Sequence, residues 1–211
     1  MPPFLKYPPL GSKTERSSST RKFISPPFAT KDISAMDSRF TSPELVDSIS
    51  TPACPAIATP AALESIRRIR AEVPEAIVGA GTIINIETLN KAIDAGAEFI
   101  VSPGTTDKMI DAALATGIPL LPGIANPSQA MRLLEKGITE MKFFPAEAAG
   151  GIPMLKSIGA PIPQISFCPT GGVSQKNVKE YYNLSNVACV GGSWMCAANL
   201  VDAEMWFDIR P

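Results

Sequence analysis

The chain has 211 residues, of which 45% are hydrophobic and 18% are charged, and its formal net charge is −1. This length and composition predict a single globular domain with one substantial core, and the near-zero charge excludes a general attraction to nucleic acid or to an anionic membrane. Histidine is absent, which excludes Ser-His-Asp and Cys-His catalysis and the common histidine-containing zinc sites. Lysine and carboxylate side chains remain for covalent and proton chemistry, and we expect small-molecule partners, with no nucleic acid and no membrane.

The amino-terminal part of the chain shows no sustained apolar periodicity. Its first 40 residues hold seven Lys or Arg and three Asp or Glu, with "RSSST" and several prolines. This composition is typical of disorder, so we expect residues 1–58 to be a disordered or atypical extension and residues 59–211 to form the folded domain. A basic, Ser-rich leader is also a feature of organellar transit peptides. Organellar import therefore stays open beside the cytoplasmic location that cysteines within apolar runs favour.

From about Pro60 onward, short apolar runs alternate with stretches of helical periodicity, at steps of about 20 to 24 residues. The glycines at 96, 117 and 137 stand where helices are expected to end. The predicted strands lie within residues 75–82, 97–104, 118–123, 141–147, 164–172 and 187–193. The predicted helices lie within residues 61–73, 86–96, 107–117, 127–137 and 175–183.

The predicted strands are almost continuously apolar, as expected when helices cover a parallel sheet. Nearly every strand ends in Gly, Pro, Thr or Ser, so polar groups gather at the carboxyl ends of the strands. Six βα units predict an α/β fold that forms most of a (β/α)8 TIM barrel, whose sites lie at that end. A doubly wound open sheet is the alternative, although the chain has neither a G-x-G-x-x-G motif nor a P-loop.

The stretch "TEMKFFPAEAAGG" places one lysine inside an apolar strand. Alternation puts Glu140, Lys142 and Phe144 on one face and Met141 and Phe143 on the other. If Lys142 points into a barrel, poor solvation favours its neutral amine, the nucleophile that forms a Schiff base with a ketone or aldehyde. The alternative is a lysine whose stem packs on a surface while its ammonium group reaches water.

Two glycine pairs follow the last two predicted strands, in "CPTGG" and "VGGSW". Each supplies backbone N–H groups without a side chain, together with the hydroxyl of Thr170 or Ser193. In barrels, an anion site is commonly built from the loops after the seventh and eighth strands. The paired positions therefore indicate a phosphate site, although either pair alone is typical of an ordinary turn.

The motifs "VGAGT", "SPG", "PLLPGI", "KFFPAEAAGG", "FCPTGG" and "GGSW", in this order, resemble those of the 2-keto-3-deoxy-6-phosphogluconate (KDPG)/4-hydroxy-2-oxoglutarate (KHG) aldolase family. The resemblance spans about Pro60 to Trp194. It implies a (β/α)8 barrel, a homotrimer and a class I aldolase that needs no metal or other cofactor. Lys142 matches the lysine that binds pyruvate as an imine, with glyceraldehyde 3-phosphate as the other product of KDPG cleavage and glyoxylate as that of KHG cleavage.

The resemblance also implies roles for residues at the strand ends. Thr82 matches a threonine that helps to hold the pyruvate carboxylate, and we assign Glu147 to structural support rather than to proton transfer. The positions that surround the substrate are Thr82, Pro103, Phe144 and Thr170. The positions that bind its phosphate are Gly171, Gly172, Gly192 and Ser193.

The chain departs from the family pattern before Pro60. The family has a glutamate that moves protons and an arginine that binds the substrate carboxylate, and an ungapped alignment puts Cys54 and Ala58 at these positions. The loss of a general acid-base group typically costs on the order of 10²–10⁴-fold in rate. We therefore expect an incomplete barrel, with the first β-α-β segment and the last helix atypical or missing. A truncated or degenerate paralogue that binds phosphate or oxo acids without turnover is the alternative function.

Overall fold

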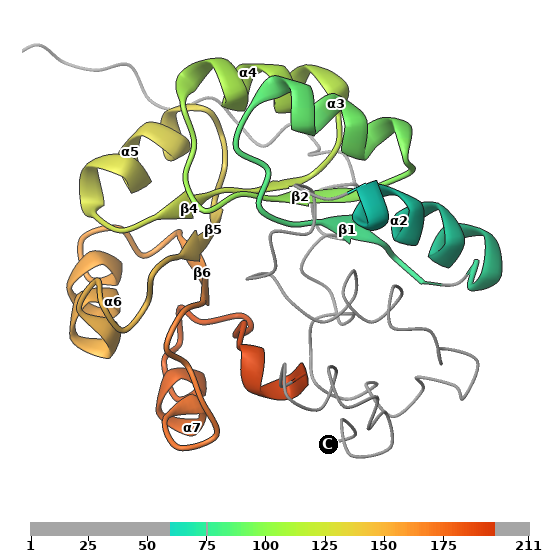
Figure 1. Ribbon diagram of the computed structural model, residues 1–211. Helices are drawn as coiled ribbons and strands as arrows, with labels where there is room; N and C mark the ends of the chain where they lie inside the picture. The colour runs from blue at the N-terminus through green and yellow to red at the C-terminus, as the bar shows by residue number, and fades with distance from the viewer. Residues whose placement is uncertain (1–59, 75, 197–211) are drawn as a thin grey trace, which may run out of the picture.

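A computed structural model of the chain describes residues 60–74 and 76–196. Within these ranges, strands and helices alternate along the chain, and Figure 1 shows the helices on the outer side of a curved row of strands. The positions of Cys54 and Ala58, the predicted extension 1–58 and the end of the chain after residue 196 lie outside the described residues. The same is true of the first β-α-β segment and the last helix.

The strands are short and all their pairings are parallel. Their bounds are β1 Gly79–Ala80, β2 Phe99–Val101, β3 Leu120–Leu121, β4 Gly123–Ile124, β5 Glu140–Phe143 and β6 Ser166–Pro169. Pro122 separates β3 from β4, yet its carbonyl oxygen accepts a hydrogen bond of 2.9 Å from the Lys142 N–H. Thus β3 and β4 are two halves of one strand position. The three-stranded sheets β1-β2-β3 and β4-β5-β6 therefore join at this position into one row of strands.

A sixth strand position follows β6. Phe167 pairs with Val187 and Thr170 pairs with Gly191, both in parallel. The described strand positions therefore neighbour each other in chain order, as in a barrel, whereas a doubly wound sheet reverses its order partway. The fold is of the (β/α) TIM-barrel type, and the described residues contain six of its strand positions.

Five of the helices match predicted segments, and their ends follow ordinary capping chemistry. The helices are α2 Pro60–Glu72, α3 Ile86–Asp94, α4 Asp107–Thr116, α5 Pro127–Glu135, α6 Gly151–Gly159 and α7 Val178–Tyr182, with a 3-10 turn η4 at Ser193–Cys196. Asn85 caps α3 by accepting a hydrogen bond of 2.8 Å from the Thr88 N–H. Gly117 ends α4 with a left-handed φ of 73°, whereas Gly96 and Gly137 lie one residue beyond the caps of α3 and α5. None of the described helices has the length and apolar character that crossing a membrane requires.

Two helices differ from the sequence prediction. The last predicted helix, 175–183, is shortened to Val178–Tyr182. Helix α6 was not among the predicted helices, because the sequence "GIPMLKSIG" begins and ends in glycine and contains a proline, all of which have low helix propensity. Tertiary packing stabilises α6 nevertheless, since Leu155 and Ile158 are fully buried.

The core lies between the strands and the surrounding helices. On β5, Met141 and Phe143 are fully buried, and the Phe143 ring packs edge-on against Phe167 of β6 with centroids 6.3 Å apart. Both belong to the cluster that includes apolar residues of all the longer helices. The alternate residue, Lys142, therefore lies on the opposite, inner face of the sheet.

Candidate active site

Lys142 is buried on the inner face of β5. Only 2% of its surface is exposed, and its Nζ lies 4.8 Å from the centroid of the Phe144 ring. Burial lowers the pKa of the Lys142 ammonium below its ordinary value of 10.5, while the charge of the nearby Cys168 in its thiolate form acts in the opposite direction. The prediction of a poorly solvated lysine is confirmed, and the alternative of a surface lysine with its ammonium in water is wrong.

A free thiol, Cys168, lies beside this lysine, and a second one, Cys189, contacts the first. Cys168 is the residue of β6 in register with Lys142, and Cys189 belongs to the sixth strand position. A hydrogen bond with Cys189, aided by Thr170 and by the nearby Lys142, lowers the pKa of Cys168, and the same bond raises that of Cys189 together with burial. In the sequence both cysteines stand within apolar runs. The place of Cys168 beside Lys142 depends on the register between β5 and β6, which those runs do not reveal.

The two predicted glycine loops lie next to each other. Thr170 pairs with Gly191, and the Gly191 N–H donates a hydrogen bond of 2.9 Å to the Pro169 carbonyl. Gly171 and Gly172 have left-handed φ values of 96° and 81°, which favour glycine. Among the described residues, no backbone carbonyl accepts a hydrogen bond from the N–H groups of Gly171, Gly172 and Gly192.

Ser193, whose side chain was assigned to the same phosphate site, is exposed at the start of η4. Thr170 is buried, and its hydroxyl donates a hydrogen bond of 3.3 Å to the Cys168 carbonyl. Backbone N–H groups at adjacent turns are suited to an oxyanion such as phosphate.

Thr82 and Pro103 stand at the carboxyl ends of β1 and β2. Thr82 has a φ of 59°, a left-handed conformation that costs free energy for a β-branched residue and that clusters at functional sites. The Pro103 carbonyl packs against Gly123, where a Cβ would come within 2.1 Å of the oxygen. Gly123 is in turn the register partner of Lys142, so Pro103 is linked to the lysine through one residue.

The predicted site residues therefore fall into two groups along one end of the sheet. Phe144, Thr170 and the glycine loops lie at the ends of β5, β6 and the sixth strand position, which are the lysine's own strand and the next two. Thr82 and Pro103 lie two or more strand positions away from the lysine on the same edge. Among the described residues, no cluster of three or more His, Cys, Asp or Glu could hold a metal ion.

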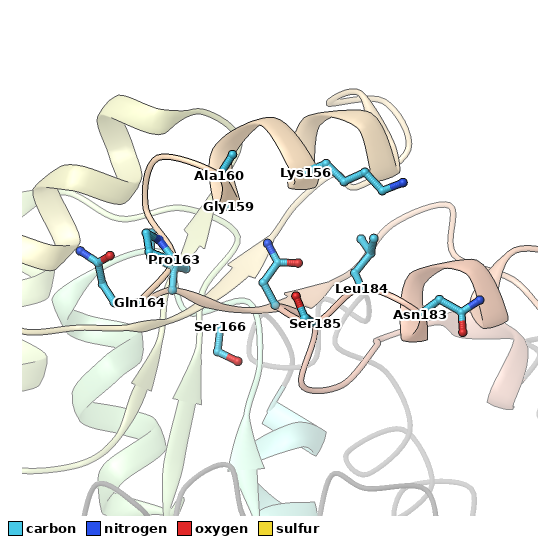
Figure 2. A pocket seen from close by; sticks show the side chains of 11 residues that line it. Lys156, Gly159, Ala160, Pro163, Gln164, Ser166, Asn183, Leu184 and Ser185 are labelled. Atoms are coloured by element: carbon cyan, nitrogen blue, oxygen red, sulfur yellow. The ribbon is translucent and has the colours of Figure 1, made fainter.

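A cavity among the described residues lies at the opposite end of β6. Its volume is about 590 Å³, and Figure 2 shows its side chains coming from the end of α6, the loop before β6 and the segment after α7. The residues that line it include Lys156, Gln164, Ser166 and Asn183, and none of the predicted site residues does. We assign the candidate site to the Lys142 end because the buried amine and the glycine loops lie there.

The chain is similar to known proteins along most of its length. A model of the family "KDPG and KHG aldolase" matches residues 31–210. The 2-dehydro-3-deoxy-phosphogluconate aldolase of Pseudoalteromonas atlantica is 50% identical over 148 residues, which are 70% of this chain and 69% of that protein. The KHG/KDPG aldolase of Escherichia coli is 48% identical over 145 residues, 69% of this chain and 68% of that protein.

Solved structures are similar as well. The KDPG aldolase of Legionella pneumophila, with pyruvate captured as a covalent carbinolamine intermediate, has a TM-score of 0.71 and 40% identity, covering 79% of this chain and 85% of that one. The aldolase of Zymomonas mobilis with 3-phosphoglycerate has a TM-score of 0.66 and 39% identity, covering 79% of this chain and 84% of that one. From the extent of the family model and the identity of these relatives, this chain belongs to the KDPG and KHG aldolase family.

Proposed function

We propose that the chain is a class I aldolase that cleaves KDPG to pyruvate and glyceraldehyde 3-phosphate through an imine on Lys142. The observation that carries the proposal is the buried amine on the inner face of β5, whose pKa burial lowers. The carbinolamine of the Legionella relative is the adduct that such an amine forms with pyruvate. The same site would accept KHG, with glyoxylate as the second product.

The proposed reaction balances in atoms and charge with water as the proton carrier. The neutral Lys142 amine adds to the C2 ketone to give a carbinolamine, which takes up a proton and loses water to form a protonated imine. The C4 hydroxyl gives its proton to water, and the electron pair of the C3–C4 bond moves toward the imine nitrogen. Glyceraldehyde 3-phosphate leaves, and the enamine takes a proton from water at C3. Water then hydrolyses the protonated imine, which releases pyruvate and a proton and regenerates the amine.

The phosphate end of the substrate would rest on the loops at Gly171–Gly172 and Gly192–Ser193. Their N–H groups would bind the phosphate beside Thr170, which is connected to Lys142 through Cys168. A relative from Zymomonas contains 3-phosphoglycerate, a compound that carries the same type of phosphate group. Thr82 and Pro103 would contact the pyruvate half of the substrate.

Borohydride reduction in the presence of pyruvate tests the imine. We expect a stable adduct that peptide mass analysis maps to Lys142, that Lys142→Met abolishes and that EDTA leaves unchanged. Lys156→Met is the matched control, because Lys156 is an exposed lysine on α6. No adduct in the native chain would refute the proposal.

Steady-state cleavage of KDPG then separates the enzyme from the paralogue that only binds. Cys54 and Ala58 stand at the positions of the family's glutamate and arginine, so an adduct without cleavage would favour that second function.

We also propose a homotrimer in the cytoplasm. Light scattering on a size-exclusion column measures the oligomeric state. Imaging of the tagged full-length chain distinguishes a cytoplasmic location from organellar import.

A further inference from the structure

Glu147 and Tyr181 form a contact that the proposed chemistry does not use. Tyr181, on α7, is fully buried, and its hydroxyl donates a hydrogen bond to Glu147 Oε1 in the loop after β5. Burial, followed by this hydrogen bond, raises the pKa of Tyr181 well above its ordinary value. The tyrosine therefore stays a neutral donor, and the carboxylate is engaged by a group 34 residues away in the chain.

The backbone and stem of Glu147 hold the first glycine loop. Its N–H donates a hydrogen bond of 3.0 Å to the Gly171 carbonyl, and the N–H of Ala146 donates one of 2.7 Å to the Thr170 carbonyl. A Cβ on Gly172 would come within 2.5 Å of Glu147 Cγ, so the glutamate stem lies directly on that glycine. A change in the position of Glu147 must therefore move Gly171 and Gly172.

The same contact also fits closely against the start of α6. A Cβ on Gly151 would lie 3.4 Å from both Glu147 Oε1 and the Tyr181 hydroxyl, and the Gly151 N–H bonds to the Ala146 carbonyl at 2.9 Å. Four pieces of chain meet at this contact: the loop that follows Lys142, the Gly171–Gly172 loop, the start of α6 and helix α7. The carboxylate at their junction is occupied by Tyr181, which argues against a role in proton transfer.

We propose that Glu147 and Tyr181 are positioning residues that set the Gly171–Gly172 loop at the correct distance from Lys142 for a phosphorylated substrate. This inference rests on the proposed function, in which that loop binds the phosphate. Loss of the contact leaves the lysine and its burial intact. It displaces the N–H groups that meet the phosphate, so substrate binding weakens and the chemical step changes little.

The test compares four single variants and one double variant of the full chain. Tyr181→Phe removes only the buried hydroxyl, and Glu147→Ala removes the acceptor from an exposed loop position. Glu147→Gln keeps an acceptor for the tyrosine. Tyr182→Phe is the control, since it removes a hydroxyl from the neighbouring, 39% exposed side chain. Thermal unfolding first identifies the variants that are folded. If Tyr181→Phe does not fold, Glu147→Ala is used for the test instead.

We expect Tyr181→Phe and Glu147→Ala each to raise the KM for KDPG about ten-fold while kcat changes less than about three-fold. Inhibition by inorganic phosphate should weaken by a similar factor, and borohydride trapping with pyruvate should be unchanged. Glu147→Gln and Tyr182→Phe should stay close to the native values. The double variant Tyr181→Phe/Glu147→Ala should be no worse than Glu147→Ala alone, because Glu147→Ala already removes the acceptor of the Tyr181 hydroxyl.

An unchanged KM and phosphate inhibition in a folded Tyr181→Phe variant would overturn the inference while the imine remains demonstrated. A fall in kcat or in trapping with KM unchanged would also overturn it, because the contact would then act on Lys142. Failure of the native chain to trap pyruvate is a different outcome, which overturns the proposed function itself.

Discussion

The substitution Gly191→Ala tests the close approach of the two glycine loops. Gly191 pairs with Thr170, and a Cβ at Gly191 would lie 2.7 Å from Thr170 Oγ1 and 3.1 Å from Cγ2. Thr170 is 3% exposed and held in the strand ladder, so it has little room to move. The φ of Gly191 is not left-handed, so the backbone accepts alanine and the cost is steric.

The magnitude follows from two opposed terms. Replacing a glycine by alanine where the backbone conformation allows it stabilises the folded protein by about 0.4–1 kcal/mol, because the unfolded chain has less conformational entropy. Overpacking of a tight site costs about 1–3 kcal/mol. We therefore expect Gly191→Ala to lower the free energy of unfolding by about 1 to 2 kcal/mol, combining these terms.

Urea denaturation followed by circular dichroism measures this change, and two controls isolate its cause. Gly104→Ala should be neutral or slightly stabilising, because no atom lies within 4 Å of the place that its Cβ would occupy. Thr170→Ala removes Oγ1 and Cγ2. The Cβ that remains at position 170 lies 3.4 Å from the place of a Cβ at position 191, which is an ordinary contact. The double variant should therefore be at least about 1 kcal/mol more stable than the sum of the single effects. Additive effects, or equal effects of Gly191→Ala and Gly104→Ala, would refute the steric reasoning.

Three further predictions concern Lys142 and a helix cap. The rate of pyruvate trapping should rise with pH with a midpoint below 10.5, because burial lowers the pKa of Lys142; a midpoint at or above 10.5 would contradict this. Between the folded pKa and 10.5 the unfolded chain binds more protons, so the stability of the native chain should rise with pH. In urea denaturation, the free energy of unfolding of Lys142→Met relative to that of the native chain should fall between pH 7 and 10.5. A difference between the two free energies that stays constant with pH would contradict this. Asn85→Ala removes the cap of α3 and should cost about 1 kcal/mol in the same assay.

Much of the fold could be predicted because its signals are local. Apolar runs, helical periodicity and glycines at helix ends each depend on a few neighbouring residues, and they placed six strands and five helices in order. Alternation within one short strand placed Lys142 on the face opposite to Met141 and Phe143, but it left open whether that face is buried, and the structure shows that it is. Helix α6 was missed because its glycines and proline hide the helical signal, and its formation depends on burial against other elements.

The chain by itself determined which chemical groups are present, their order and which face of a strand each one occupies. Only the tertiary structure decided which groups meet. The register of β5 against β6 puts Cys168 beside Lys142, and the packing of α7 brings Tyr181 to Glu147 across 34 residues of sequence. Such contacts depend on how separate strands and helices are aligned in space, and local patterns carry no information on that alignment because each element is compatible with several registers.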